Sequence, residues 1–387
     1  MALTWAALEA FGTNPGGGQR PPGLRRTGLG KRQRTPAEEA FLADWNAESE
    51  AAGLHLSASS ADYYFSSYSH YGVHEEVLKD SVTTHAYLHG IRQNKHLFKN
   101  KIVLDIGSGI GAFALLAAEA GAQRVIGIEL QQELVRMATA SARHNNFREG
   151  VVDFICGTVA SITKLPDDIE HVDIIISDFM GYFLLYESRL TDLLQARERW
   201  LSPDGRIFPD KASLHVALLD DAQYRDQHFE YFGSVWGFDF SALKVPAASD
   251  PVVSVFQAKQ LLSAPHCILD LDLRTCPVSA GSSLAASFDL RCKRQGRVHA
   301  MVGWFDIGFS ACHKYVSFST APDADETCWK QTAFFLGSAI AVKASDTVRC
   351  MIALKKPYED HRHLEVKLSM SLVGRAGQTR KEHYHWT

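Results

Sequence analysis

The sequence predicts an α/β fold in its middle part, and three features carry this prediction. From about residue 100, short runs of β-branched residues alternate with stretches of helical pattern. A glycine-rich turn follows the first run, and acidic residues end two of the later runs, at Glu129 and Asp178. Strands that are separated by helices form βαβ units with right-handed crossovers, so we expect a parallel sheet.

The expected elements follow one another in chain order. Residues 101–106 (KIVLDI) predict the first strand, and residues 112–122 (AFALLAAEAGA) predict an Ala/Leu helix after the glycine-rich turn. Further buried strands are expected at residues 123–130, 152–158 and 172–178. Ligands of such sheets bind beyond the carboxyl ends of the strands, so the residues at that edge are candidates for a site.

The composition is that of a globular protein with room for two domains. The chain has 387 residues, 46% hydrophobic and 22% charged, and its net charge of -4 gives no reason to expect nucleic-acid or membrane binding. The seven cysteines show no C-x-x-C or zinc spacing, which predicts free thiols in a reducing compartment and no metal. No apolar run approaches the roughly 18 residues of a membrane span, and no signal cleavage site is evident. We therefore expect a soluble, cytoplasmic protein.

The amino-terminal segment differs in composition from the rest of the chain. Residues 12–36 are rich in Gly and Pro and contain no acidic residue; their basic residues are Arg20, Arg25, Arg26, Lys31, Arg32 and Arg34. Such a segment cannot bury enough apolar surface to offset its ordering entropy. We expect residues 1–50 to form a disordered basic extension. A nucleic-acid or nuclear-import patch, which would add a nuclear location, is the alternative.

The glycine-rich turn is a candidate nucleotide-cofactor site. It follows Asp105 and contains Gly107, Gly109 and Gly111, whose missing β-carbons allow close approach of a ligand to the backbone. Glu129, at the end of the next expected strand, is placed to accept hydrogen bonds from ribose hydroxyls. The combination resembles class I methyltransferases that use S-adenosylmethionine more than it resembles NAD enzymes. A tight turn without a ligand is the open alternative.

Six segments resemble, in the same order, motifs of the protein arginine methyltransferases, and of the type I group in particular, which makes asymmetric dimethylarginine. They are 62–80 (DYYFSSYSHYGVHEEVLKD), 103–113 (VLDIGSGIGAF), 125–130 (VIGIEL), 177–190 (SDFMGYFLLYESRL), 201–210 (LSPDGRIFPD) and 327–335 (TCWKQTAFF). The likeness implies a class I methyltransferase Rossmann-like domain with N-terminal helices at residues 51–206. A β-barrel domain at residues 207–387 would follow, with an inserted helical dimerisation arm at about 220–240.

The resemblance also implies how the chain assembles. The arm would dock on a second subunit's cofactor domain in a head-to-tail ring dimer, either with itself or with an active relative. Its aromatic residues suit an interface anchor, with ordinary core packing as the alternative. These residues are Tyr224, Phe229, Tyr231, Phe232 and Trp236.

The family's chemistry gives the two carboxylates of residues 177–190 a role. A guanidinium is a poor nucleophile because its charge is delocalised and its pKa lies above about 12. Two carboxylates that bind its N–H groups orient it and localise the charge away from the attacking nitrogen, while the methyl group arrives in line from the sulfonium. The resemblance assigns these roles to Asp178 and Glu187. Substrates of such enzymes are arginine-rich proteins, often RNA-binding.

The resemblance further implies the residues that bind S-adenosylmethionine. They lie in the YF-x-x-Y segment, the glycine-rich turn and the end of the next strand, and are Tyr64, Phe65, Tyr68, Asp105, Gly107, Gly109, Gly111 and Glu129.

Several residues depart from the family pattern. Asp178 replaces a Glu and is one methylene shorter. Cys328 stands where the family has a His that pairs with an Asp, retained here as Asp80, and a thiol accepts a proton poorly at neutral pH. Thr83 replaces an Arg that binds the cofactor carboxylate, and Ala160 replaces a Glu that accepts from the adenine amine.

Two Met positions near the substrate pocket are also changed, to Val77 and Arg189. If Arg189 faced the pocket, it would repel an incoming guanidinium, and the alternative is that it points to solvent.

Together, these departures predict a catalytically impaired paralogue, or pseudoenzyme. It would bind S-adenosylmethionine weakly or not at all and act as a regulatory subunit that assembles with an active arginine methyltransferase. An active type I enzyme with altered substrate choice is the first alternative. The second is an RNA-associated module that acts through the basic tail.

Overall fold

A computed structural model of the protein describes residues 35–37, 39–40, 71–148, 150–356, 363–375 and 379–386. Nearly all of the expected basic extension lies outside these residues, as do Tyr64, Phe65 and Tyr68 of the cofactor prediction. The predictions for these residues stay predictions.

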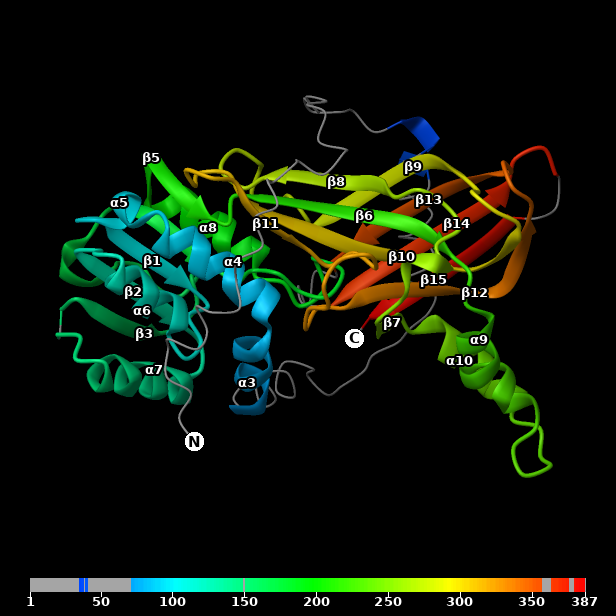
Figure 1. Ribbon diagram of the computed structural model, residues 1–387, viewed down its shortest axis with the longest axis horizontal. Coiled ribbons are helices and arrows are strands. Elements are labelled where there is room, and N and C mark those ends of the chain that lie inside the picture. The colour runs from blue at the N-terminus through cyan, green and yellow to red at the C-terminus, as the bar shows by residue number, and fades with distance from the viewer. Residues whose placement is uncertain are drawn as a thin grey trace.

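The first half of the chain folds around the parallel sheet that the sequence predicts (Figure 1). Its strand order is β3-β2-β1-β4-β5, and all four pairings are parallel. The three central strands are almost entirely buried because both faces of the sheet are covered. The strands are β1 (Ile102–Ile106), β2 (Arg124–Glu129), β3 (Val152–Cys156), β4 (Val172–Ser177) and β5 (Leu201–Phe208).

Helices connect these strands and precede the first of them. The connecting elements are α6 (Ala112–Glu119), α7 (Gln132–His144), η3 (Pro166–Asp168) and α8 (Leu190–Trp200). The preceding helices are α3 (Tyr71–Lys79), α4 (Ser81–Arg92) and α5 (Lys95–Phe98). α4 begins after Asp80 because the Asp80 carboxylate accepts hydrogen bonds from the Val82 and Thr83 amides, as an N-cap residue does.

The second half of the chain is a barrel-like domain of two antiparallel sheets. One has the order β7-β12-β10-β6-β8 with β11 paired to β10, and the other has the order β15-β14-β13-β9. The strands are β6 (Lys211–Leu219), β7 (Val252–Ser254), β8 (His266–Asp272), β9 (Ser283–Arg291), β10 (Gly296–Phe309), β11 (Val316–Ser319), β12 (Gln331–Val342), β13 (Thr347–Lys355), β14 (Leu364–Leu372) and β15 (Thr379–Trp386); η6 (Ala258–Gln260) precedes β8. This architecture confirms the predicted fold class.

The two halves share one core. On α4, Tyr87 is fully buried and meets Phe309 of β10 edge to face, with ring centroids 5.1 Å apart. Two polar contacts also join the halves. The Asn94 side chain accepts from the His313 amide at 2.8 Å, and Asp80 accepts from the Cys328 amide at 2.9 Å. The barrel loop that contains Cys328 is therefore attached to the start of α4.

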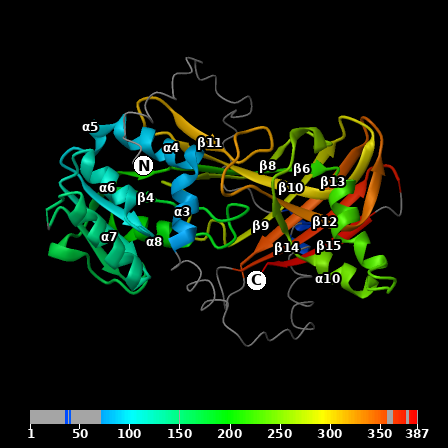
Figure 2. The same ribbon diagram turned by 60° about the horizontal axis from the view of Figure 1, so that its bottom comes forward.

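A helical arm projects from the barrel after β6, away from the parallel sheet (Figures 1 and 2). It comprises α9 (Ala222–His228), η4 (Glu230–Gly233), η5 (Ser241–Leu243) and α10 (Lys244–Ser249), so it extends beyond the expected residues 220–240. Within the part of the chain that the structure describes, no helix has the length and apolar character of a membrane span.

The aromatic residues of the arm fall into two groups. Tyr224 and Phe229 pack on Phe335 of the barrel, at centroid distances of 4.9 and 5.4 Å, so they attach the arm to its own barrel. Phe232 is half-buried. The exposed apolar side chains are Tyr231, Trp236, Phe238, Phe240 and Leu243, of which Trp236 is 90% exposed.

Candidate active site

Three predicted site segments meet at the carboxyl edge of the parallel sheet. β1 leads into residues 107–111, called here the glycine loop, β2 ends at Glu129, and β4 leads into residues 178–188, called here the clamp loop. Parallel neighbours end at the same edge, so the strand order alone brings these segments together.

The glycine loop needs its glycines for backbone conformation and for packing. Gly107, Gly109 and Gly111 all have positive φ, at 70°, 53° and 84°. A Cβ at Gly111 would lie 2.6 Å from the Phe154 ring, so a larger residue there would have to displace that ring. These constraints exist without a ligand, and the orientation of the neighbouring polar groups must therefore decide whether the loop binds one.

Glu129 stabilises the glycine loop from the end of β2. The residue is 4% exposed, and its Oε2 accepts from the Gly109 amide at 2.9 Å while Oε1 accepts from the Gln131 amide at 3.0 Å. A carboxylate offers about four acceptor positions, so two remain for ligand hydroxyls.

Buried polar atoms without a hydrogen-bond partner gather at this edge. Among the described residues, the Ser108 hydroxyl and Asp178 Oδ1 are buried without a hydrogen-bond partner, and the two buried carboxylate oxygens of Asp105 make no hydrogen bond of good geometry. Burial raises the pKa of Asp105 to about 7; the nearby Ala114 amide opposes the shift, and the Glu129 and Asp178 charges add to it. Buried polar groups are normally satisfied, so this cluster fits a polar ligand with several donors. The described part of the chain contains no group of side chains suited to a metal ion.

The clamp loop is compact and strained. Its ends are joined because the Arg189 amide donates to the Phe179 carbonyl at 2.9 Å. A Cβ at Gly181 would lie 1.7 Å from the Tyr186 carbonyl oxygen, so this position excludes any other residue. Phe183, Leu184 and Glu187 have φ of 51°, 64° and 55°, a conformation that costs non-glycine residues roughly 1–3 kcal/mol each. Strain of this kind is retained where packing over-determines the backbone.

The clamp carboxylates lie at the two ends of this loop. Burial raises the pKa of Asp178 to about 6, while the Arg189 charge opposes the shift and the Asp80 charge adds to it. Glu187 is half-buried and keeps its place at the other end of the loop. The loop can therefore present two carboxylates, one of which titrates close to neutral pH.

Aromatic stacking fixes the clamp loop from the far end of the chain. Trp386 of β15 stacks on Tyr186 with ring centroids 4.1 Å apart and an interplanar angle of 6°. Tyr182 lies 6.3 Å from the Trp386 ring centroid and 6.1 Å from that of Trp329. The sequence pattern does not identify Trp386, because nothing local to β15 indicates what its last side chain touches.

Asp80 joins the barrel loop to the start of α4. Its Oδ2 accepts from the Thr83 hydroxyl and from the Cys328 amide, both at 2.9 Å. Burial raises the pKa of the Cys328 thiol, and the Asp80 charge adds to the effect. The thiol therefore stays protonated at neutral pH and does not serve as a proton acceptor.

The other departures have distinct surroundings. Thr83 is 1% exposed and directs its hydroxyl to Asp80. Ala160 is exposed in the turn after β3, and Val77 is half-buried on α3. Arg189 is half-buried: a Cβ at Gly107 would lie 2.7 Å from its Cδ and 2.9 Å from its Nη1. Its side chain thus lies on the glycine loop and does not extend into solvent.

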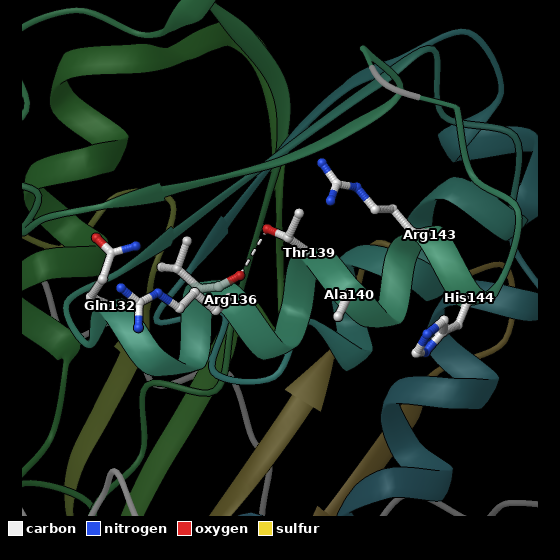
Figure 3. Close-up of a pocket in the computed structure, with 7 residues that line it drawn as sticks. Gln132, Arg136, Thr139, Ala140, Arg143 and His144 are labelled. Carbon is white, nitrogen blue, oxygen red and sulfur yellow. Dashed lines mark hydrogen bonds between the residues drawn. The ribbon is translucent and has the colours of Figure 1, made fainter.

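Two surface hollows differ in charge. One of about 610 Å³ lies between α3 and the barrel loop and is lined by Glu75, Glu76, Asp80, Glu326 and Cys328, together with Lys79 and Lys330. The other, of about 470 Å³, lies on the face of α7 that carries Arg136, Arg143 and His144 (Figure 3). The first adjoins Asp80 and Cys328 and is mainly acidic.

Comparison with known proteins gives a consistent result over both halves of the chain. A model described as a methyltransferase domain matches residues 103–205, and one described as an arginine methyltransferase oligomerization subdomain matches residues 210–375. The chain is 40% identical over 317 residues to Protein arginine N-methyltransferase 1 of Caenorhabditis elegans, covering 82% of this chain and 90% of that protein. It is 42% identical over 311 residues to the protein of that name from Schizosaccharomyces pombe, covering 80% and 90%.

Solved structures show the same architecture. A chain of the Trypanosoma brucei PRMT1 enzyme-prozyme heterotetrameric complex with AdoHcy matches with a TM-score of 0.77 and 34% identity, covering 83% of this chain and 100% of that chain. Arabidopsis thaliana protein arginine methyltransferase 10 matches with a TM-score of 0.72 and 29% identity, covering 83% and 99%.

The prediction of a regulatory subunit, or pseudoenzyme, is wrong. Four relatives that are 38% to 42% identical over at least 80% of this chain are all named as protein arginine N-methyltransferases. The prediction took the departures together as lost functions, although the residue types alone do not show what surrounds each position. In the structure the Thr83 hydroxyl satisfies Asp80, and the clamp loop retains carboxylates at both ends.

Both halves of the chain match arginine methyltransferase models or proteins over most of their length, and the structure has the same two-part architecture. The chain therefore belongs to the protein arginine methyltransferase family, whose members use S-adenosylmethionine and form oligomers.

Proposed function

We propose that this chain is an active protein arginine N-methyltransferase of type I, which transfers methyl groups from S-adenosylmethionine to arginine side chains of proteins. The observation that carries the proposal is Asp178 Oδ1. It is buried without a partner at the edge where the clamp loop meets the glycine loop. An acceptor in this position is open to a donor from a ligand.

Asp178 and Glu187 would bind the N–H groups of the guanidinium. Hydrogen bonds between a charged donor and a carboxylate are about twice as strong as neutral ones, and two carboxylates fix the plane of the group. The strained loop backbone and the stack of Trp386 on Tyr186 restrict the movement of both carboxylates. This pre-organisation matters because a misplacement of about 1 Å can cost on the order of 10²-fold in rate.

Asp178 would also accept the proton that the methylated nitrogen releases. A general base works best with a pKa near the operating pH, and burial raises the pKa of Asp178 to about 6. The Cys328 thiol cannot take this role because burial raises its pKa. The proton would pass from the substrate nitrogen to Oδ1 of Asp178.

The cofactor would lie over the glycine loop. Glu129 has acceptor positions for the ribose hydroxyls, and Asp105 and Ser108 provide unpaired polar atoms next to them. S-adenosylmethionine supplies an electrophilic methyl group on a positively charged sulfur. The exposed Ala160 offers no acceptor to the adenine amine, so we expect weaker binding than in relatives with a Glu at this place.

The acidic hollow beside Asp80 supports an arginine-rich substrate. Its carboxylates would attract a cationic peptide and raise its local concentration near the clamp loop. Assembly through the exposed aromatics of the arm, as a dimer of this chain, is part of the same proposal. The RNA-binding role of the basic tail and the cytoplasmic and nuclear location stay predictions.

Methyl transfer by the purified chain alone tests the proposal. An arginine-rich peptide should gain monomethylarginine and then asymmetric dimethylarginine, measured by mass spectrometry with fragmentation that separates the dimethyl isomers. Asp178→Asn and Glu187→Gln should each lower the rate by about 10²-fold or more. Transfer only after addition of another methyltransferase, or an undiminished rate in both variants, would overturn it.

A further inference from the structure

Thr83, at the start of α4, cannot supply a positive charge to the cofactor site. Its hydroxyl donates to Asp80 at 2.9 Å and its side chain is 1% exposed. The fold nevertheless places two basic side chains against the glycine loop, Arg189 and His74. A Cβ at Gly107 would lie 2.9 Å from Nη1 and 3.0 Å from Nε of Arg189, and one at Gly109 would lie 3.6 Å from His74.

The charges around the glycine loop are mostly negative. Asp105 and Glu129 flank the loop, and Asp178 begins the next segment at the same edge. Burial raises the pKa of Asp105 and of Asp178, and in both cases the positive charge of Arg189 opposes the rise. The guanidinium of Arg189 is thus electrostatically coupled to both acids, in agreement with its position on Gly107.

The backbone holds Arg189 in this position. Its amide closes the clamp loop by donating to the Phe179 carbonyl at 2.9 Å, and α8 begins at the next residue. Its side chain therefore extends from a constrained point next to Asp178 toward the glycine loop.

The ligand's own charges require a cation here. The amino-acid end of S-adenosylmethionine carries an ammonium and a carboxylate. The acids around the glycine loop attract the ammonium and repel the carboxylate. A guanidinium binds a carboxylate through two parallel N–H···O bonds, which a Lys ammonium does not reproduce.

We propose that Arg189 binds the carboxylate of the cofactor's amino-acid group, from the end of the clamp loop, and so supplies the charge that Thr83 does not. This inference rests on the proposed function. It also links the two halves of the site, because the residue that receives the cofactor then closes the loop that holds the guanidinium. Cofactor binding would brace the clamp loop before the substrate arrives.

Calorimetry with a pair of ligands tests the assignment. S-adenosylmethionine and its decarboxylated analogue differ only in the carboxylate, so the ratio of their dissociation constants measures what the carboxylate contributes. The unmodified chain should bind the complete cofactor about 10- to 100-fold more tightly. Arg189→Met should lose a similar factor for the complete cofactor and show nearly equal affinity for both ligands. Arg189→Lys should fall between.

Two control substitutions separate Arg189 from other cations. Arg136→Met removes an arginine of α7 (Figure 3) whose side chain is 71% exposed, and should leave the preference unchanged. His74→Gln should also retain it. Loss of the preference in His74→Gln but not in Arg189→Met would overturn the proposal, and so would tighter cofactor binding by Arg189→Met, which would mean that Arg189 blocks the site.

The outcomes also separate this inference from the proposed function. A chain that binds and transfers methyl groups, with an unchanged ligand preference in Arg189→Met, refutes the role of Arg189 alone. A chain that binds neither ligand refutes both. Arg189→Met should remain folded, because its helix-starting contact is made by the backbone, and a thermal unfolding scan verifies this.

Discussion

Lowering the pH should suppress methyl transfer through Asp178, whose pKa burial raises to about 6. The ionised carboxylate must bind the guanidinium and accept its proton, so only this form of the free enzyme is productive. Below its pKa the ionised fraction falls about tenfold per pH unit, so kcat/KM at pH 5 should be roughly one tenth of its value at pH 8. The fall in kcat should occur at a lower pH than the fall in kcat/KM, because the bound cation stabilises the ionised carboxylate of Asp178.

The assay is kcat/KM for an arginine-rich peptide from pH 5 to pH 8.5 at saturating cofactor, with circular dichroism at each pH to verify the fold. Burial raises the pKa of Asp105 to about 7, so a second group titrates nearby. Asp178→Asn separates them: its activity should be lower by about 10² or more, with no limb near 6. If kcat/KM stays constant down to pH 5, or if the residual activity of Asp178→Asn still falls near pH 6, the assignment of this titration to Asp178 is refuted.

Three further perturbations have definite expected results. Asp105→Asn should raise the free energy of unfolding by at most about 4 kcal/mol at pH 8 and hardly at pH 4. The reason is that the pKa of Asp105 is about 7 in the folded chain and about 3.8 in the unfolded chain, so its ionisation destabilises the fold as the pH rises between these values. An equal gain in unfolding free energy at both pH values, measured by urea unfolding, would contradict this. Trp386→Ala should lower kcat/KM about tenfold, because it removes a stack worth about 0.5–1.5 kcal/mol and loosens the clamp loop, whereas Trp386→Phe should retain most of the rate. Calorimetry should show unchanged cofactor affinity in both variants, and equal rates for both variants and the unmodified chain would exclude this role. Trp236→Ser combined with Phe238→Ser should dissociate the dimer, as measured by sedimentation velocity, whereas Val373→Ser, which changes an exposed apolar residue outside the arm, should leave it intact. A dimer that survives the double substitution does not use the arm.

For the departures from the family pattern, the residue type at a position does not show what surrounds that residue in the fold. Thr83 reads in the sequence as a lost positive charge, and Cys328 as a lost base. In the structure both contact Asp80, one through its hydroxyl and the other through its amide. A list of replaced residues does not show whether a neighbour takes over the lost role. Arg189, counted as a further departure near the substrate pocket, lies beside the glycine loop, where we propose that it binds the cofactor's carboxylate.

The order of strands and helices was decided by local pattern, since apolar runs, glycines with positive φ and an N-capping Asp act within a few residues of their own position. The same pattern located Asp105, Glu129 and Asp178, because a residue that ends a parallel strand must lie at the carboxyl edge of the sheet. Other properties depended on residues far apart in the chain. Trp386 reaches Tyr186 across 200 residues, Phe335 buries Phe229 of the arm, and burial among distant residues raises the pKa of Asp178 to about 6. Desolvation and stacking depend on the whole surroundings of a side chain, so only the tertiary structure decides them.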